Sequence, residues 1–176
     1  FIAFGGSGQI LNLLALAYLN RDGSELIEAD MGYKDVSRTA YKYKTAGVDT
    51  NVIRVPMTSD HRHDLNAMLS AITPRTSLIV ITNPNNPTGT LLSYAELERF
   101  VNAVPSNIII LIDEAYVHFT EDPTYRRAIP LALTNDNVIV TRTFSKVYGM
   151  PGMRLGYAVS GGTIQEQLEF YQPIIN

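Results

Sequence analysis

The regular alternation of short apolar runs with helix-like patterns constrains the fold of this chain more than any other feature. Several apolar runs are almost wholly hydrophobic, which is typical of strands that are buried on both faces of a sheet. We predict strands at residues 1–4, 26–29, 52–55, 78–82, 108–112, 138–141 and 155–159. We predict helices at residues 9–19, 34–46, 65–71, 94–104 and 126–133, the fourth capped by Ser93 and Glu96. This alternation indicates a three-layer α/β/α fold around a mostly parallel seven-stranded sheet.

Composition narrows the classes of partner. The 176 residues, 45% hydrophobic and 18% charged, suffice for one domain with a substantial core. A net charge of −3 and the lack of a long basic run argue against nucleic acid and against an anionic membrane surface. The apolar run at 10–19 is too short to span a bilayer. The chain has no cysteine, which excludes disulfides and cysteine catalysis and is compatible with a reducing compartment. Small molecules are therefore the favoured ligands.

Polar residues follow four of the predicted strands. Parallel strands share a direction, so the loops after residues 4, 82, 112 and 141 should open at one edge of the sheet, where such folds bind ligands. The first loop, GGSGQ at 5–9, precedes an apolar helix whose free N–H groups favour an anion, notably phosphate. A tight turn capped by Ser7 is the simpler alternative, and Leu11 leaves the GxGxxG fingerprint incomplete.

An Asp-Glu pair follows the fifth predicted strand and has two interpretations. Asp113 and Glu114 could bind magnesium in a P-loop ATPase, but no lysine of the chain follows a glycine, so that motif is absent. Alternatively, the rim carries a carboxylate, a phenol, an amide, a lysine and an arginine. This set fits a phosphorylated, electron-withdrawing cofactor bound through a lysine, and pyridoxal 5′-phosphate meets each requirement.

Three linked motifs carry a family resemblance. They are NNPTG at 85–89, DEAY at 113–116 and TFSK at 143–146, with Arg154 eight residues after the lysine. In identity, order and approximate separation they resemble the fold-type I, class I/II aminotransferases, and most closely the histidinol-phosphate aminotransferase branch. The resemblance covers nearly the whole chain as the large, cofactor-binding domain.

The resemblance implies a role for each site residue. Lys146 would form the Schiff base with pyridoxal 5′-phosphate and then act as the acid/base, and Asp113 would pair with the pyridine nitrogen. The remaining implied contacts are Tyr116 and Asn86 to the ring oxygen, Tyr33 and Ala115 on the two ring faces, and a phosphate site formed by the backbone of Ser7, Gly8 and Gln9, the hydroxyls of Thr143 and Ser145, and Arg154.

The resemblance also implies what surrounds this domain. The chain begins within a strand-like run and ends without a tail, so we expect a fragment, with 1–160 as the large domain and 161–176 leading to a small domain. We expect a cytoplasmic homodimer that moves an amino group from an amino acid, or an amine such as histidinol phosphate, to a 2-oxo acid. A decarboxylase, lyase or oxidase on the same fold, or a non-catalytic sensor that binds the cofactor, remains the alternative.

Some features depart from the pattern or have simpler explanations. Gly8-Gln9 replaces the usual Asp-Glu of the first loop, and no proline precedes Tyr33 in the turn at 30–32, so the substrate stays open. His61 and His63 lack further ligands at a metal-binding spacing. We therefore predict a solvated loop there and no metal.

Overall fold

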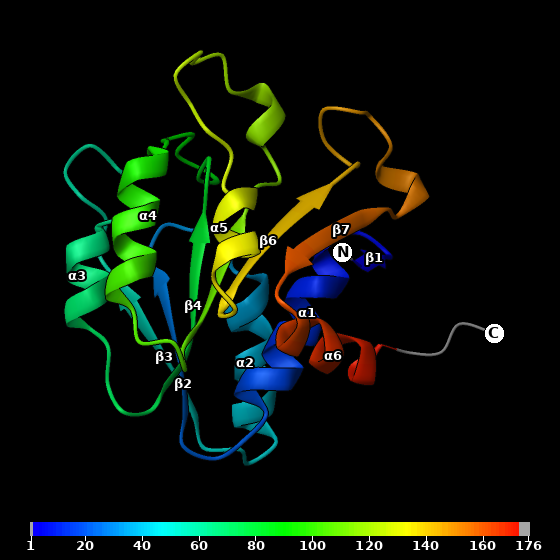
Figure 1. The fold of residues 1–176 in the computed structure, drawn as a ribbon. Helices are drawn as coiled ribbons and strands as arrows, with labels where there is room; N and C mark the ends of the chain where they lie inside the picture. Colours follow the sequence, from blue (N-terminus) through cyan, green and yellow to red (C-terminus); the bar gives the residue numbers. More distant parts are fainter. Residues whose placement is uncertain (1, 173–176) are drawn as a thin grey trace.

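The chain forms one twisted sheet with helices packed on both faces (Figure 1). The computed structural model of the protein describes residues 2–172. Within that range the strands are β1 (Ile2–Phe4), β2 (Ser24–Ala29), β3 (Thr50–Val55), β4 (Thr76–Thr82), β5 (Ile109–Asp113), β6 (Val138–Thr143) and β7 (Gly156–Ser160), in the order β1-β7-β6-β5-β4-β2-β3. Pairing is parallel from β3 to β6, and β7 is antiparallel to both β6 and β1. The predicted mostly parallel, seven-stranded α/β sheet is confirmed, although Phe1 lies outside the described residues.

The helices form the two outer layers. They are α1 (Ser7–Leu19), α2 (Asp35–Thr45), α3 (Leu65–Ser70), α4 (Tyr94–Ala103), α5 (Ile129–Thr134) and α6 (Gly162–Tyr171), with short 3₁₀ turns at Val117–Phe119 and Pro151–Met153. Residues of α1, α2 and α6 share one apolar core with the sheet, and residues of α3, α4 and α5 share the other. This is the predicted three-layer arrangement.

Strand β4 shows why the apolar runs are nearly continuous. Leu78 and Val80 pack in the core beneath α1 and α2, whereas Ile79 and Ile81 pack in the core beneath α3 and α4. Successive side chains of a strand point to opposite faces, so a strand covered on both sides needs apolar residues at every position.

Most predicted boundaries hold to within a few residues. The capping box that begins α4 is confirmed, because Ser93 accepts from the Glu96 N–H and Glu96 accepts from the Ser93 N–H. The alternative of a turn capped by Ser7 is wrong: Ser7 is the first residue of α1, and that helix begins without a side-chain cap. Helix α5 begins at Ile129, later than predicted, because the chain from 114 to 128 runs as turns that tie Ala128 N–H to Glu114.

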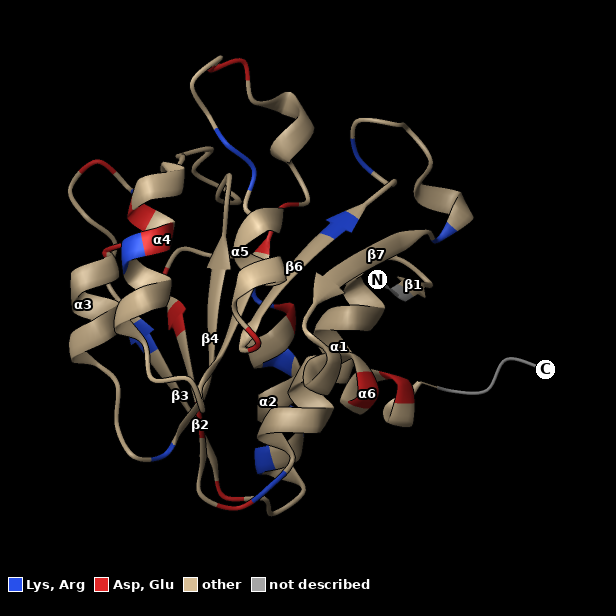
Figure 2. Cartoon of the chain, viewed as in Figure 1, with Lys and Arg blue, Asp and Glu red and all other residues tan. Residues whose placement is uncertain are grey.

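Charge is mixed over the fold. Figure 2 shows basic and acidic residues together on α4 and on the loops at the carboxyl ends of the strands, without a one-sign face in this view. Among the helices between residues 2 and 172, none has both the length and the apolar character that a membrane crossing needs. The division at residue 160 stays a prediction, and residues 173–176 lie outside the described range.

Candidate active site at the carboxyl edge of the sheet

Three polar residues lie in one row across the carboxyl ends of the central strands. Thr82 on β4 is in register with Asp113 on β5, and Asp113 is in register with Thr141 on β6. All three are buried. Strand alternation turns them toward the sheet face that α1 covers, because Val80, Leu111 and Ile139, two residues earlier in each strand, pack in that core. The row therefore lies beneath a site between the strand ends and the start of α1, with Thr82 and Asp113 at its floor.

A small pocket opens directly above this row. It is lined by Ser7, Tyr33, Thr82, Asn86, Asp113, Ala115, Tyr116 and Lys146. Seven of these eight residues are predicted site residues, drawn from five separate loops or strand ends. Thr82 is the residue that the motifs did not indicate, since a threonine that ends an apolar strand carries no distinctive sequence signal.

Asp113 supplies the buried negative charge of the pocket. Its side chain accepts a hydrogen bond from Thr141 Oγ1 at 2.9 Å, and the residue is 3% exposed. Burial raises the pKa of Asp113 to about 6; the hydrogen bonds from Thr141 and the Ala115 N–H lower it, and the carboxylates of Glu114 and Asp35 raise it. A cation placed beside Asp113 would favour its ionised form, which suits a protonated ring nitrogen.

Lys146 and Tyr116 face each other across the pocket. Lys146 follows β6 and is exposed, and its Nζ lies 5.1 Å from the centroid of the Tyr116 ring. The amine therefore combines access to a ligand with a position beside a phenol. A lysine amine placed so can form a covalent link to an aldehyde and can carry a proton.

Tyr33 covers a side of the pocket from the start of α2. Its hydroxyl donates to Asp35 Oδ2 at 2.7 Å, which fixes the ring while leaving the residue 38% exposed. Burial, together with this hydrogen bond and the Asp35 charge, raises the pKa of Tyr33 to about 12. The ring is therefore a neutral aromatic surface at neutral pH.

The start of α1 and the loop after β6 together make a site suited to an anion. Arg154 Nη1 donates to Ser145 Oγ at 3.3 Å, and its Nη2 donates to the Gly5 carbonyl at 3.5 Å. The guanidinium lies so close to Gly6, which has φ 87°, that a Cβ on residue 6 would collide with it. The arginine is thus held beside the first turn of α1, whose N–H groups point away from the helix.

The other predicted phosphate ligands lie in the same two segments, the start of α1 and the turn after β6. Thr143 Oγ1 accepts from the Ser145 N–H at 3.1 Å, which fixes the turn that leads to Lys146. Gln9 Oε1 accepts from the Gly5 N–H at 2.6 Å, so the Gln9 side chain is engaged in the loop itself. Gly8 is the second residue of α1. The phosphate-binding roles of these residues stay predictions.

A buried ion pair behind the pocket was not predicted from the sequence. Arg142 donates to Glu114 Oε2 through Nε at 2.8 Å and Nη2 at 2.6 Å, and the two side chains are 6% and 0% exposed. Glu114 Oε1 also accepts from the Ala128 N–H at 2.7 Å and the Tyr125 hydroxyl at 3.2 Å. Glu114 and Arg142 directly follow Asp113 and Thr141, so the pair holds the two strand ends that build the pocket floor.

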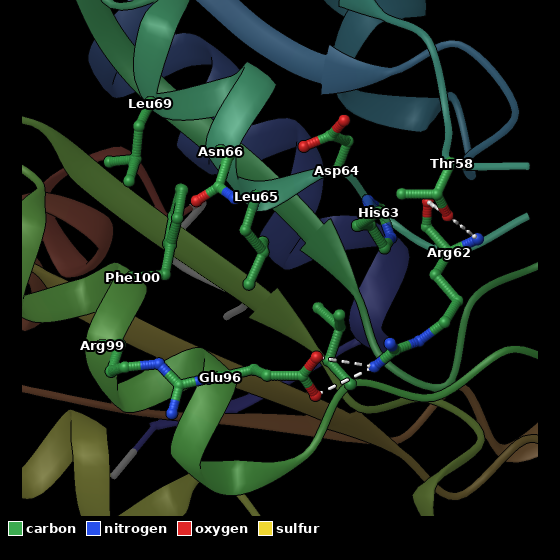
Figure 3. Close-up of a pocket in the computed structure, with 11 residues that line it drawn as sticks. Thr58, Arg62, His63, Asp64, Leu65, Asn66, Leu69, Glu96, Arg99 and Phe100 are labelled. Carbon is green, nitrogen blue, oxygen red and sulfur yellow. Dashed lines mark hydrogen bonds and ion pairs between the residues drawn. The ribbon is translucent and has the colours of Figure 1, made fainter.

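A second hollow lies on the other side of the sheet, between α3 and α4 (Figure 3). Of its two arginines, Arg62 and Arg99, Arg62 points to Glu96, with Nη2 2.9 Å from both carboxylate oxygens, and also donates to the Leu91 carbonyl. The contacts of Arg62 with Glu96 and Leu91 join the loop before α3 to α4. We assign this hollow a structural role.

The histidine loop beside that hollow differs from the prediction. His61 is exposed, as expected, but His63 is only 5% exposed, and its Nε2 lies 3.0 Å from the Thr82 carbonyl. The prediction of a wholly solvated loop is therefore wrong for His63, whose pKa is lowered by burial. Asp64 caps α3 by accepting from the Ala67 N–H. Within residues 2–172 no three His, Asp or Glu side chains gather in a way that would hold a metal ion.

Comparison with known proteins gives the family. The family model described as aminotransferase class I and II matches residues 1–174. The chain belongs to this family. Its members depend on pyridoxal 5′-phosphate, which is the cofactor that the rim residues indicated.

The relatives of this class I and II aminotransferase chain include two substrate types. It is 46% identical to an aromatic amino acid aminotransferase of Rhodococcus jostii, over 88% of this chain and 41% of that protein. It is 40% identical to a histidinol-phosphate aminotransferase of Moorella thermoacetica, over 88% of this chain and 39% of that protein. The chain thus spans about two fifths of the length of the curated relatives it matches.

A solved structure agrees with the fold. The histidinol-phosphate aminotransferase of Sinorhizobium meliloti, determined in complex with pyridoxal 5′-phosphate, superimposes with a TM-score of 0.83 and 26% identity. The match covers 97% of this chain and 45% of that one. The resemblance to the histidinol-phosphate aminotransferase branch is confirmed at the level of family and fold, and the aromatic relatives widen the range of substrates to consider.

Proposed function

We propose that the protein containing this chain is a pyridoxal-phosphate-dependent aminotransferase that moves an amino group between an amino acid or amine and a 2-oxo acid. The observation that carries the proposal is the convergence of Lys146, Asp113, Tyr116, Asn86 and Tyr33 on one pocket at the carboxyl edge of the sheet. Each of these residues taken alone has an ordinary structural explanation. Their convergence on one pocket from separate loops, beside Arg154 and the start of α1, is instead explained by binding of this cofactor.

The residues fit the cofactor. Bound pyridoxal 5′-phosphate supplies an aldehyde that links to amines and a protonated ring that withdraws electrons from the substrate α-carbon. Asp113 offers a buried carboxylate for the ring nitrogen, and Ala115, beside it, presents only a methyl group to the pocket. Tyr33 offers an aromatic face, and Arg154 with the first turn of α1 offers a site for a dianion.

The chain's own residues then account for the proton movements. Lys146 Nζ would hold the cofactor covalently in the resting protein. Once an amino donor displaces it, the freed Nζ would act as the acid/base that takes a proton from the donor's α-carbon and delivers it to the cofactor C4′. The Tyr116 phenol and Asn86 amide would donate to the ring oxygen.

The names of the relatives support a donor with a planar ring. Histidinol phosphate carries an imidazole, and aromatic amino acids carry phenyl, phenol or indole rings. We therefore propose donors with an aromatic or heteroaromatic side chain, histidinol phosphate among them, and a 2-oxo acid acceptor. A panel of donors, each assayed with and without 2-oxoglutarate, would test this. Product formed without the acceptor would instead indicate decarboxylation, elimination or oxidation.

The role of Lys146 can be tested by spectroscopy. We expect the whole wild-type protein to show the visible absorbance of lysine-bound cofactor and Lys146→Ala to lose it. Lys42→Ala is the matched control, because Lys42 is exposed on α2 away from the pocket. Retention of the band in Lys146→Ala, or its loss in Lys42→Ala, would contradict the assignment.

We also propose a homodimer, on the basis of family membership. Light scattering of the whole protein should give twice the mass of one chain. A monomer with full activity would contradict this proposal without affecting the assignment of the cofactor site.

A further inference from the structure

The Thr141 hydroxyl has a specific partner at the floor of the pocket. Thr141 is fully buried in the carboxyl-terminal half of β6, and its Oγ1 donates to Asp113 Oδ1 at 2.9 Å. The strand register places the two residues directly opposite one another on adjacent parallel strands. On the other side, Thr141 is in register with Ala158 of β7, so the neighbouring strand presents a methyl group rather than a competing acceptor. The hydroxyl is therefore committed to Asp113.

The charges that face Asp113 make this side-chain donor important. Glu114 follows it on the same strand end, and Asp35 approaches from α2; both disfavour a second negative charge. Glu114 is neutralised by Arg142, while Asp35 binds the Tyr33 hydroxyl and Arg38. Lys146 lines the same pocket from the loop after β6. Burial and these two carboxylates disfavour the ionised form of Asp113. The Thr141 hydroxyl and the Ala115 N–H donate hydrogen bonds to the carboxylate and favour that form.

We propose that Thr141 is a positioning residue for the cofactor: its hydroxyl orients the Asp113 carboxylate and keeps it ionised for pairing with the ring nitrogen. This inference rests on the proposed function, because it concerns the same site. Thr141 itself does not line the pocket, so it acts through Asp113. A valine has the same shape without the donor, whereas a serine keeps the donor and loses a methyl group.

Three variants of the whole protein separate positioning from packing. Thr141→Val removes the donor, and Thr141→Ser retains it. Thr50→Val is the matched control: Thr50 is also a buried strand threonine, its hydroxyl has no hydrogen-bond partner among residues 2–172, and it lies on the far edge strand β3. Two quantities are measured for each: the dissociation constant of pyridoxal 5′-phosphate between pH 5 and 8, and the titration of the Asp113 carboxyl carbon by NMR in cofactor-free protein.

The expected result follows from the loss of one hydrogen bond to a charged group. Thr141→Val should raise the Asp113 titration midpoint by roughly one pH unit and, at pH values below that midpoint, weaken cofactor binding about tenfold. The pH below which affinity falls should move upward by the same amount, because the cofactor binds the ionised carboxylate. The other titratable groups of the site are the same in every variant, so the comparison isolates the change at Asp113. Thr141→Ser and Thr50→Val should match the wild type.

Several outcomes would overturn the inference. An Asp113 midpoint in Thr141→Val that equals the wild-type value would remove Thr141 from this role, as would a Thr141→Ser that behaves like the valine variant. A similar shift in Thr50→Val would indicate a general packing effect. Wild-type protein that fails to bind the cofactor would instead contradict the proposed function, and the NMR titration would still decide whether Thr141 controls the carboxylate.

Discussion

Replacing Glu114 by glutamine should destabilise the protein far more than its modest chemical change suggests. The glutamine keeps the size of the side chain but leaves the Arg142 guanidinium, 6% exposed, without its counter-charge. Removing one partner of a buried ion pair typically costs about 3–5 kcal/mol, because the remaining charge stays desolvated. For a domain of this size each kcal/mol lowers the melting temperature by about 2–4 °C, so the expected decrease is roughly 6–20 °C.

Two comparisons isolate the ion pair in this experiment. The surface pair Arg75–Asp49, with side chains 45% and 66% exposed, should lose at most about 1 kcal/mol in Asp49→Asn. The double variant Glu114→Gln, Arg142→Met should be more stable than Glu114→Gln alone, since the unpaired charge is gone. Urea titration and thermal unfolding of the whole protein measure these differences. A cost for Glu114→Gln no larger than that of Asp49→Asn would refute the reasoning that desolvation makes this pair sensitive.

Two further predictions concern a helix start and the buried carboxylate. Ser93→Ala should lose about 1 kcal/mol of unfolding free energy by removing the cap of α4, while Ser93→Asp, which retains an acceptor, should lose little; equal losses in urea titration would contradict this. Asp113→Asn should stabilise the cofactor-free protein at pH 7 by up to roughly 3 kcal/mol while abolishing tight cofactor binding. In the wild type the folded-state pKa of Asp113, about 6, exceeds the ordinary 3.8. The free energy of unfolding of the wild type therefore decreases as pH rises from about 4 to 6. The free energies of unfolding of the wild type and of Asp113→Asn, measured from pH 4 to 8, should therefore converge at the acidic end. Parallel curves would contradict this prediction.

The sequence predicted the layers and the pocket because both depend on local patterns. Two-sided burial makes each central strand apolar throughout, which marks its position, and parallel direction brings the loops after those strands to one edge. The pairing of Glu114 with Arg142 was not predictable in this way. The two residues are 28 positions apart, and their contact follows from the register of β5 with β6, which no periodicity within either strand defines. His63 was misjudged for a similar reason: its polar neighbours indicate a loop, while its burial depends on the distant Thr82 carbonyl.

The same strand register explains why the residues at the pocket and the residues of the buried ion pair are neighbours in the sequence. On β5 and its continuation, Asp113 turns toward the face covered by α1, and Glu114 turns to the opposite face. On β6, Thr141 follows the first direction and Arg142 the second. Each neighbouring pair of residues thus supplies one member to the sheet face that carries the pocket and one to the ion pair on the opposite face. A slip of one residue between β5 and β6 would exchange these faces and place Arg142 rather than Thr141 beside the pocket floor. The Glu114–Arg142 pair can form only in the native register, so it stabilises the same alignment that brings the Thr141 hydroxyl to the Asp113 carboxylate.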